Sequence, residues 1–107
     1  MSILIAGAGP SGARLAQLLS SNGISVILVE RLRHHKHNCF SSAVVPISAI
    51  ESGLVPLESV STLWKGWQIY DPNNKRYKWT STNHLGAILD FGKLRQKLWN
   101  DAIKSGV

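Results

Sequence analysis

Three glycines and one acid near the start of the chain have the types and spacing of a nucleotide site. Gly7, Gly9 and Gly12 follow a short apolar run, and Glu30 ends a second apolar run eighteen positions after the last glycine. Glycines at this spacing allow, in order, a tight turn, a close approach of the backbone to a pyrophosphate, and close packing of a helix on a strand. The carboxylate lies near the roughly twenty-residue distance expected of an acid that accepts hydrogen bonds from a ribose. The pattern therefore predicts a dinucleotide site.

The residues beside the glycines fit the same chemistry. Pro10 suits the first turn of a helix, where an N–H group has no intrahelical acceptor in any case. The free N–H groups and the dipole of that helix favour an anion, and Ser11 adds a hydroxyl group nearby. An acid at the ribose position disfavours a 2′-phosphate, so NADP is not expected. The candidate cofactor-binding residues are Gly7, Ala8, Gly9, Pro10, Ser11, Gly12 and Glu30.

These residues need a strand, a helix and a second strand to position them, and residues 2–30 have that pattern. The first strand begins at Ser2, and a helix with a small and apolar side follows, which Asn22 and Gly23 should end. The continuous apolar run Val26–Val29 indicates a strand that is buried on both faces. The helix is expected to pack through Ala13, Leu15, Ala16, Leu18 and Leu19. The fold class is therefore α/β, a Rossmann-type FAD/NAD(P)-binding βαβ unit.

The run Gly-Ala-Gly-Pro-Ser-Gly-Ala, with Glu-Arg after the second strand, resembles the FAD-binding N-terminus of a flavoprotein group. That group includes p-hydroxybenzoate-hydroxylase-type monooxygenases, geranylgeranyl reductases and lycopene cyclases. Pro10 and the pair Glu30-Arg31 favour FAD over NAD. The resemblance implies that residues 7–12 hold the FAD pyrophosphate, that Glu30 binds the adenosine ribose, and that Arg31 lies beside the adenine or the phosphates. It implies no particular reaction, and the catalytic residues stay unknown.

Residues 31–59 are expected to form a flavin-side loop and a short helix. The histidines of His34–His37 suggest a metal, but adjacent side chains converge poorly and no acid or cysteine lies at ligand spacing. An exposed basic loop is the preferred interpretation, and no metal is predicted. In the geranylgeranyl-reductase-like families a loop here approaches the flavin. Cys39 lacks the glycines that commonly follow it there, so it is either a small buried residue or a reactive thiol.

The following serines, Ser41 and Ser42, either bind the cofactor or cap a helix around Ile47–Ser52, which Gly53 ends.

Residues 60–82 are predicted to form an inserted β-hairpin, with strands at 63–70 and 76–80 around a turn rich in Asp, Pro and Asn. Trp67 and Ile69 should share one face of the first strand, and Tyr77 and Trp79 should share a face of the second. The tryptophans Trp64, Trp67 and Trp79 either line a pocket for an apolar, isoprenoid-type substrate or pack across the strands.

A strand and a helix over residues 85–105 should return to the nucleotide domain. The helix is expected to bury Phe91, Leu94, Leu98 and Ala102. Related flavoproteins commonly have an Arg near position 91 that approaches the cofactor. Arg95 either takes that role from the next turn or lies on the surface.

Length and charge limit the function classes. With 107 residues the chain is one small domain, too short for a complete enzyme of this group, and we expect an N-terminal fragment of a longer flavoprotein. The net charge of +6 is dispersed, which favours an anionic cofactor over nucleic acid. No apolar stretch is long enough for a membrane helix, and a cytoplasmic location is predicted.

The expected function is FAD binding within a flavin-dependent oxidoreductase. The alternatives are an NAD-dependent dehydrogenase fragment and a non-catalytic nucleotide-binding or interaction module.

Overall fold

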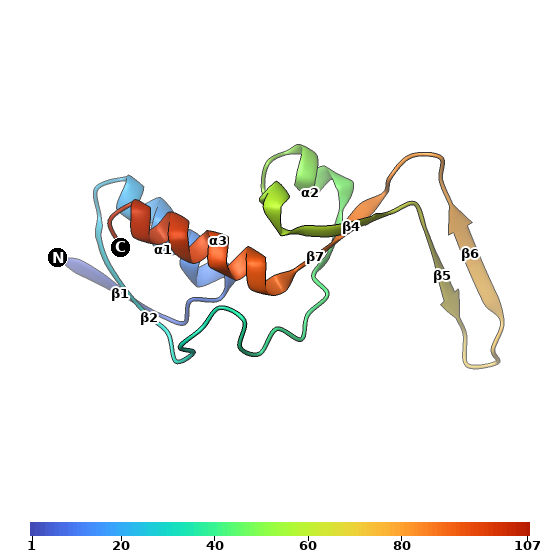
Figure 1. The fold of residues 1–107 in the computed structure, drawn as a ribbon, viewed down its shortest axis with the longest axis horizontal. Helices are drawn as coiled ribbons and strands as arrows, with labels where there is room; N and C mark the ends of the chain where they lie inside the picture. Colours follow the sequence, from blue (N-terminus) through green and yellow to red (C-terminus); the bar gives the residue numbers. More distant parts are fainter. The chain divides into compact units, whose positions relative to one another are not determined.

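A computed structural model describes all of residues 1–107, which divide into two compact units. The first unit contains Met1–Phe40 and Phe91–Val107, and the second contains Ser41–Asp90. Figure 1 follows the chain through its strands and helices from the N-terminus in blue to the C-terminus in red. None of the helices is long and apolar enough to cross a membrane.

The first unit contains the predicted βαβ arrangement. Strand β1 (Ser2–Ala6) leads into helix α1 (Pro10–Ser21), and strand β2 (Ser25–Val29) pairs with β1 in parallel. The chain leaves α1 through Gly23 at a φ of 79°, a left-handed conformation that glycine adopts without strain, so the predicted helix stop is confirmed. Helix α3 (Phe91–Lys104) completes the unit by packing against α1. The α/β, Rossmann-type fold class with an inserted hairpin is confirmed.

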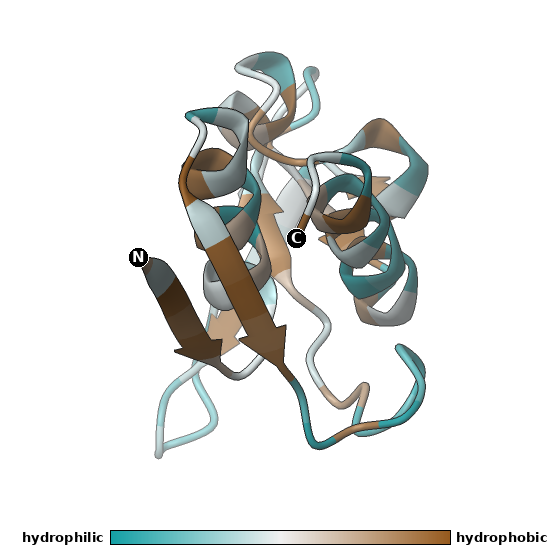
Figure 2. Ribbon diagram, turned by 90° about the vertical axis from the view of Figure 1, so that its left-hand side faces the viewer, coloured by the Kyte–Doolittle hydropathy of each residue, from teal (hydrophilic) through white to brown (hydrophobic).

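Small residues form the core of this unit. Ala13, Ala16 and Ala102 are almost fully buried, which lets α1 approach the sheet and α3 closely. Two expectations were wrong. Leu15 and Leu18 of α1 are exposed, and β2 is not buried on both faces: Ile27 and Val29 alternate with the more enclosed Val26 and Leu28 and are exposed. The reason is that the sheet has only two strands, with α1 packed on it, so much of their apolar surface, brown in Figure 2, has no cover within the unit.

The second unit contains a small antiparallel sheet and a separate hairpin. Its sheet has the order β3 (Val44–Pro46), β7 (Gly86–Leu89), β4 (Val60–Trp64). Helix α2 (Ile47–Glu51) follows β3 directly. The chain leaves this helix through Gly53, whose φ is 74°. A single turn of 3₁₀ helix, Leu57–Ser59, precedes β4. The hairpin pairs β5 (Gly66–Tyr70) with β6 (Arg76–Thr80).

The predicted first strand of the hairpin, residues 63–70, is two strands that belong to different sheets. Trp64 ends β4 opposite Gly86 of β7, whereas Gly66 begins β5 opposite Thr80 of β6. A Cβ atom at Gly86 would overlap the Trp64 ring, so the glycine makes room for that ring beside the strand. The chain changes partner at Lys65, whose carbonyl oxygen accepts a hydrogen bond from the N–H of Ser81.

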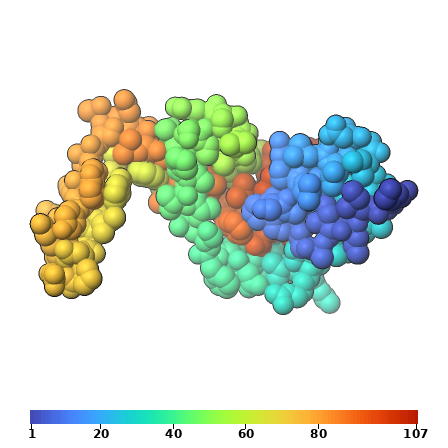
Figure 3. All heavy atoms as spheres, turned by 180° about the vertical axis from the view of Figure 1, so that it is seen from behind, coloured from blue at the N-terminus to red at the C-terminus, as the bar shows by residue number.

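The faces of the hairpin are as predicted. Trp67 lies opposite Trp79 and Ile69 opposite Tyr77, so these side chains share one face. The two tryptophan rings stack, with their centroids 4.1 Å apart and an angle of 15° between their planes. In Figure 3 the hairpin, yellow to orange, projects from the green part of the same unit, which leaves its aromatic face exposed. Trp64 and Trp67 line one surface hollow, and Trp67 and Trp79 line another.

Candidate nucleotide-binding site

The three glycines of the loop between β1 and α1 have three different physical reasons to be glycine. Gly7 has a φ of 100°, which side chains rarely adopt, and its N–H donates to the carbonyl oxygen of Val29 at 2.7 Å. At Gly12 a Cβ atom would overlap the Gly7 carbonyl oxygen, so the helix approaches the end of β1 more closely than alanine permits. At Gly9 a Cβ atom would meet nothing within 4 Å. The predicted tight turn and close packing are confirmed, and the space at Gly9 is open for a ligand.

The start of α1 offers hydrogen-bond donors to an anion. Pro10 is the first helical residue, Gly9 is the N-cap, and no side chain caps the helix. The N–H groups of Ser11 and Gly12 lie in the first turn, where an α-helix provides no acceptor. The side chain of Ser11 is exposed beside them. Together with the helix dipole, these donors form a site that suits a phosphate.

Glu30, the first residue after β2, bonds to the same loop. One carboxylate oxygen accepts from the N–H of Ala8 at 2.7 Å, and the other accepts from the N–H of Leu32 at 2.8 Å. The N–H groups of Leu32 and Ala8 hold the pKa of Glu30 below its usual 4.5. The carboxylate is therefore ionised at neutral pH and fixed at the end of the glycine loop, where its remaining lone pairs can accept from ribose hydroxyls. The side chain of Arg31, next in the chain, is exposed.

Helix α3 supplies two residues that were not predicted to hold the site. The indole Nε1–H of Trp99 donates to the carbonyl oxygen of Ala8 at 2.6 Å. Arg95 is 7% exposed, which excludes the predicted alternative of a surface residue, and its guanidinium donates to the carbonyl oxygens of His35 and His37. The resemblance had drawn attention to Arg95, but not to its contacts with this loop, and Trp99 was not singled out. Their separation by four positions places both residues on one face of the helix.

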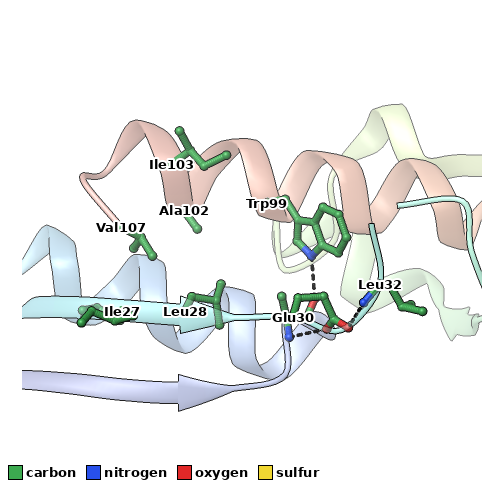
Figure 4. A pocket seen from close by; sticks show the side chains of 10 residues that line it. Ile27, Leu28, Glu30, Leu32, Trp99, Ala102, Ile103 and Val107 are labelled. Atoms are coloured by element: carbon green, nitrogen blue, oxygen red, sulfur yellow. Dashed lines mark hydrogen bonds between the residues drawn. The ribbon is translucent and has the colours of Figure 1, made fainter. Parts of the chain in front are cut away.

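An apolar cavity of about 380 Å³ lies beside these contacts, between α3 and β2. Figure 4 shows the indole of Trp99 pointing from α3 toward the glycine loop, with the carboxylate of Glu30 below it. The dashed lines mark the hydrogen bond of the indole and the two hydrogen bonds of the carboxylate. Glu30 and Trp99 form the polar end of the cavity, and the rest is aliphatic. The lining residues are Ala8, Val26, Ile27, Leu28, Glu30, Leu32, Trp99, Ala102, Ile103 and Val107.

The basic stretch after Glu30 folds back on itself. The rings of His34 and His35 lie 4.2 Å apart, centroid to centroid, and no group of three or more His, Cys, Asp or Glu side chains is placed to hold a metal ion. Cys39 is a partly buried free thiol whose Sγ donates to the carbonyl oxygen of His35 at 3.2 Å. The side chain of Ser41 bonds to the N–H of Ala43. The side chain of this serine therefore does not cap α2, for which the structure has no side-chain cap.

Comparison with known proteins agrees with this geometry. Residues 1–45 match the sequence model of a family described as an FAD binding domain. A search of curated protein sequences finds no match. The matched segment contains the glycine loop, α1, β2 and Glu30.

Solved structures share the fold over almost the whole chain. A geranylgeranyl bacteriochlorophyll reductase-like protein from Thermoplasma acidophilum superimposes with a TM-score of 0.82 at 21% identity over 98% of this chain and 28% of its own. The myxobacterial chondrochloren halogenase, a variant of FAD-dependent halogenases, gives 0.68 at 16% identity over 97% of this chain and 26% of its own. A Diels-Alderase of pyrroindomycin biosynthesis gives 0.65 at 17% identity, over 99% and 24%.

At this level of identity the likeness shows the fold, and the chain spans about a quarter of the length of these proteins. The family match adds the cofactor, FAD. Residues 1–45 thus resemble an FAD binding domain, and the chain as a whole has the fold of these solved structures.

Proposed function

We propose that the first unit binds FAD through its ADP moiety. Residues 7–12, from Gly7 through Ala8, Gly9, Pro10 and Ser11 to Gly12, bind the pyrophosphate with the N–H groups at the start of α1. Glu30 accepts hydrogen bonds from the adenosine ribose, and Arg31 lies beside the adenine or the phosphates.

One observation carries this proposal: the open space at Gly9 adjoins both free helical donors and an ionised carboxylate. A Cβ atom at Gly9 would meet no atom within 4 Å, so the backbone is accessible where a diphosphate has to approach it. The N–H groups of Ser11 and Gly12 provide donors for phosphate oxygens. The carboxylate of Glu30, bound to the Ala8 N–H at 2.7 Å, provides acceptors for hydroxyl groups beside them. The donors and acceptors therefore follow the order of phosphate and ribose in an ADP group.

The whole protein is proposed to be a flavin-dependent oxidoreductase of the geranylgeranyl-reductase or lycopene-cyclase-like branch. The resemblance of residues 7–13 and of the pair Glu30-Arg31 supports this branch, as does the fold of the reductase-like neighbour. An apolar, isoprenoid-type substrate is part of the same proposal. Bound FAD would supply hydride or oxygen chemistry. This chain's own residues bind and orient its ADP half. Because the chain corresponds to about a quarter of such a protein, we expect the 107 residues alone to be inactive.

Two other functions make different predictions. An NAD-dependent dehydrogenase would use the same glycines and Glu30, because NAD contains the same ADP group. A non-catalytic module would bind neither dinucleotide. The exposed aromatic face of the β5–β6 hairpin is the feature that favours an interaction role, since large exposed apolar surfaces commonly mark binding sites.

Titration calorimetry of the chain with ADP, FAD, NAD, FMN and NADP tests the proposal. We expect ADP and FAD to bind with similar affinity, FMN to bind at least tenfold more weakly because it lacks the adenosine, and NADP to be rejected by Glu30. NAD binding more than tenfold tighter than FAD would favour the dehydrogenase. Absence of binding by both ADP and FAD to the folded chain would contradict the proposal and favour the non-catalytic module.

A further inference from the structure

Arg95 is a buried cation whose partners are main-chain carbonyl oxygens of one loop. Its guanidinium donates to His35 at 3.0 Å and also to His37, and it lies 3.9 Å from the Sγ of Cys39. The Phe91 ring covers it, with the guanidinium carbon 4.9 Å from the ring centroid. Burying a charge is costly unless hydrogen bonds compensate, so this arrangement holds only while the loop supplies its carbonyl groups.

The loop that Arg95 binds is the one that begins at Glu30. Within this loop the N–H of Leu32 donates to a carboxylate oxygen of Glu30 at 2.8 Å, and this hydrogen bond is the largest of the effects that lower the pKa of Glu30. The other hydrogen bonds after Leu32 lie within the loop itself, such as that from the N–H of His37 to the carbonyl oxygen of His34 at 3.0 Å. The loop has no regular secondary structure, and its side chains are mostly exposed. The hydrogen bonds from Arg95 to these two carbonyl groups therefore attach the loop to helix α3.

We infer that Arg95 is a positioning residue for the nucleotide. By binding the carbonyl oxygens of His35 and His37, it orders residues 31–40 and so presents the carboxylate of Glu30 to the ribose. This inference rests on the proposed function, in which Glu30 binds the ribose hydroxyls. Both carbonyl oxygens accept from the same guanidinium nitrogen, Nη1, and the planar group to which it belongs packs over the Phe91 ring. A lysine ammonium is a point charge on a flexible stem and lacks this planar packing.

Three variants test the inference. Arg95→Lys retains the charge and removes the planar donor arrangement, Arg95→Ala removes both, and Lys104→Ala removes an exposed cation from the end of the same helix as the control. The first readout is the ratio of the dissociation constants of 2′-deoxy-ADP and ADP, measured by calorimetry. This ratio reports the ribose contact and is insensitive to a general loss of stability. We expect about tenfold for the wild type and the control, from one hydrogen bond to a charged group, and a ratio approaching one for both Arg95 variants.

The second readout is limited trypsin digestion of the free protein, because Arg33 and Lys36 lie in the loop. Arg95→Lys should increase cleavage there at least threefold, while cleavage at Arg14 within α1, a marker of global unfolding, stays at the wild-type rate. ADP should protect the loop in the wild type.

The possible results separate the inference from the proposed function. If wild-type protein does not bind ADP, the proposed function fails and the inference with it. If wild-type protein binds ADP and Arg95→Lys keeps the tenfold ratio, the inference alone is overturned. Unchanged cleavage at Arg33 and Lys36 also overturns it. If Arg14 is cleaved faster in both Arg95 variants, the residue serves only global stability, and the inference is again wrong.

Discussion

Replacing Gly9 and Gly12 by alanine, one at a time, should separate nucleotide binding from folding. Gly9 has a φ of −64° and a ψ of 177°, which alanine adopts readily, and its Cβ atom would meet nothing within 4 Å. Gly9→Ala should therefore leave the free energy of unfolding unchanged or raise it by about 0.4–1 kcal/mol, because alanine restricts the unfolded chain. The new methyl group occupies the space proposed for the pyrophosphate. ADP affinity should fall at least tenfold, or about 1.4 kcal/mol.

Gly12→Ala should have the opposite profile. Its Cβ atom would overlap the Gly7 carbonyl oxygen, and it would also lie 3.2 Å from the carbonyl carbon and 3.5 Å from a methyl group of Ile5. The obstacle is backbone, and the N–H of the same Gly7 bonds to β2, so the overlap has to be relieved by moving the helix from the strand. Overpacking of this kind costs about 1–3 kcal/mol, and we expect the upper end of that range. This is a large fraction of the stability of a small domain.

Urea denaturation of both variants, followed by calorimetric titration with ADP under conditions where each is folded, gives the two quantities. If Gly9→Ala binds ADP as tightly as the wild type, the diphosphate does not approach that position. If Gly12→Ala unfolds at the wild-type urea concentration, α1 is not packed on the end of β1 as closely as the structure indicates. Loss of ADP binding by a Gly12→Ala protein that has unfolded does not count for the proposal, since folding explains it.

Three other changes test the remaining contacts. Glu30→Gln should weaken ADP binding about tenfold, because a charged acceptor becomes neutral. The pH test uses FAD, because the terminal phosphate of ADP itself titrates near pH 6. Wild-type affinity for FAD should hold as the pH falls to 4.5 and decline below that, as the pH passes through the lowered pKa of Glu30. Glu30→Gln should lack this decline, and Glu51→Gln, a control in the second unit, should keep it. Trp99→Phe removes the bond to the Ala8 carbonyl oxygen and should lower the free energy of unfolding by about 1 kcal/mol, so an unchanged urea midpoint would contradict that bond. Gly86→Ala places a methyl group against a tryptophan ring and a backbone oxygen, and should destabilise the second unit by about 3 kcal/mol; unchanged hydrogen exchange there would argue against this packing.

The sequence predicts best where one residue type has a single physical justification. A positive φ at Gly7 and an overlap at Gly12 each exclude other residues, so the turn and the close packing could be inferred from spacing alone. The hairpin faces were equally predictable, because alternation along a strand decides which side chains share a face. The stacked pair of Trp67 and Trp79 follows directly from that alternation and the turn between the strands.

Prediction failed where the outcome depends on partners distant in the chain. The apolar run at 63–70 has the composition of one strand. In the structure its first residues, at the end of β4, pair with β7, and its later residues, in β5, pair with β6. Leu15 and Leu18 look like core residues by type, yet they lie on the side of α1 that no element of the unit covers. Arg95 is the clearest case. The carbonyl groups that bind its buried guanidinium lie some 60 residues earlier in the chain, so no pattern in the sequence around Arg95 predicts its burial.

The glycine loop itself is held by residues that its own motif does not contain. Ala8 uses both of its backbone groups: its N–H donates to Glu30, 22 residues away, and its carbonyl oxygen accepts from Trp99, 91 residues away. The contact with Trp99 therefore exists only when Phe91–Val107 has packed against Met1–Phe40. A ligand that binds only the assembled loop stabilises that packing by mass action, whether or not it contacts α3. Residues 1–45 are thus enough to identify the nucleotide motif, whereas its geometry in the folded protein also depends on α3.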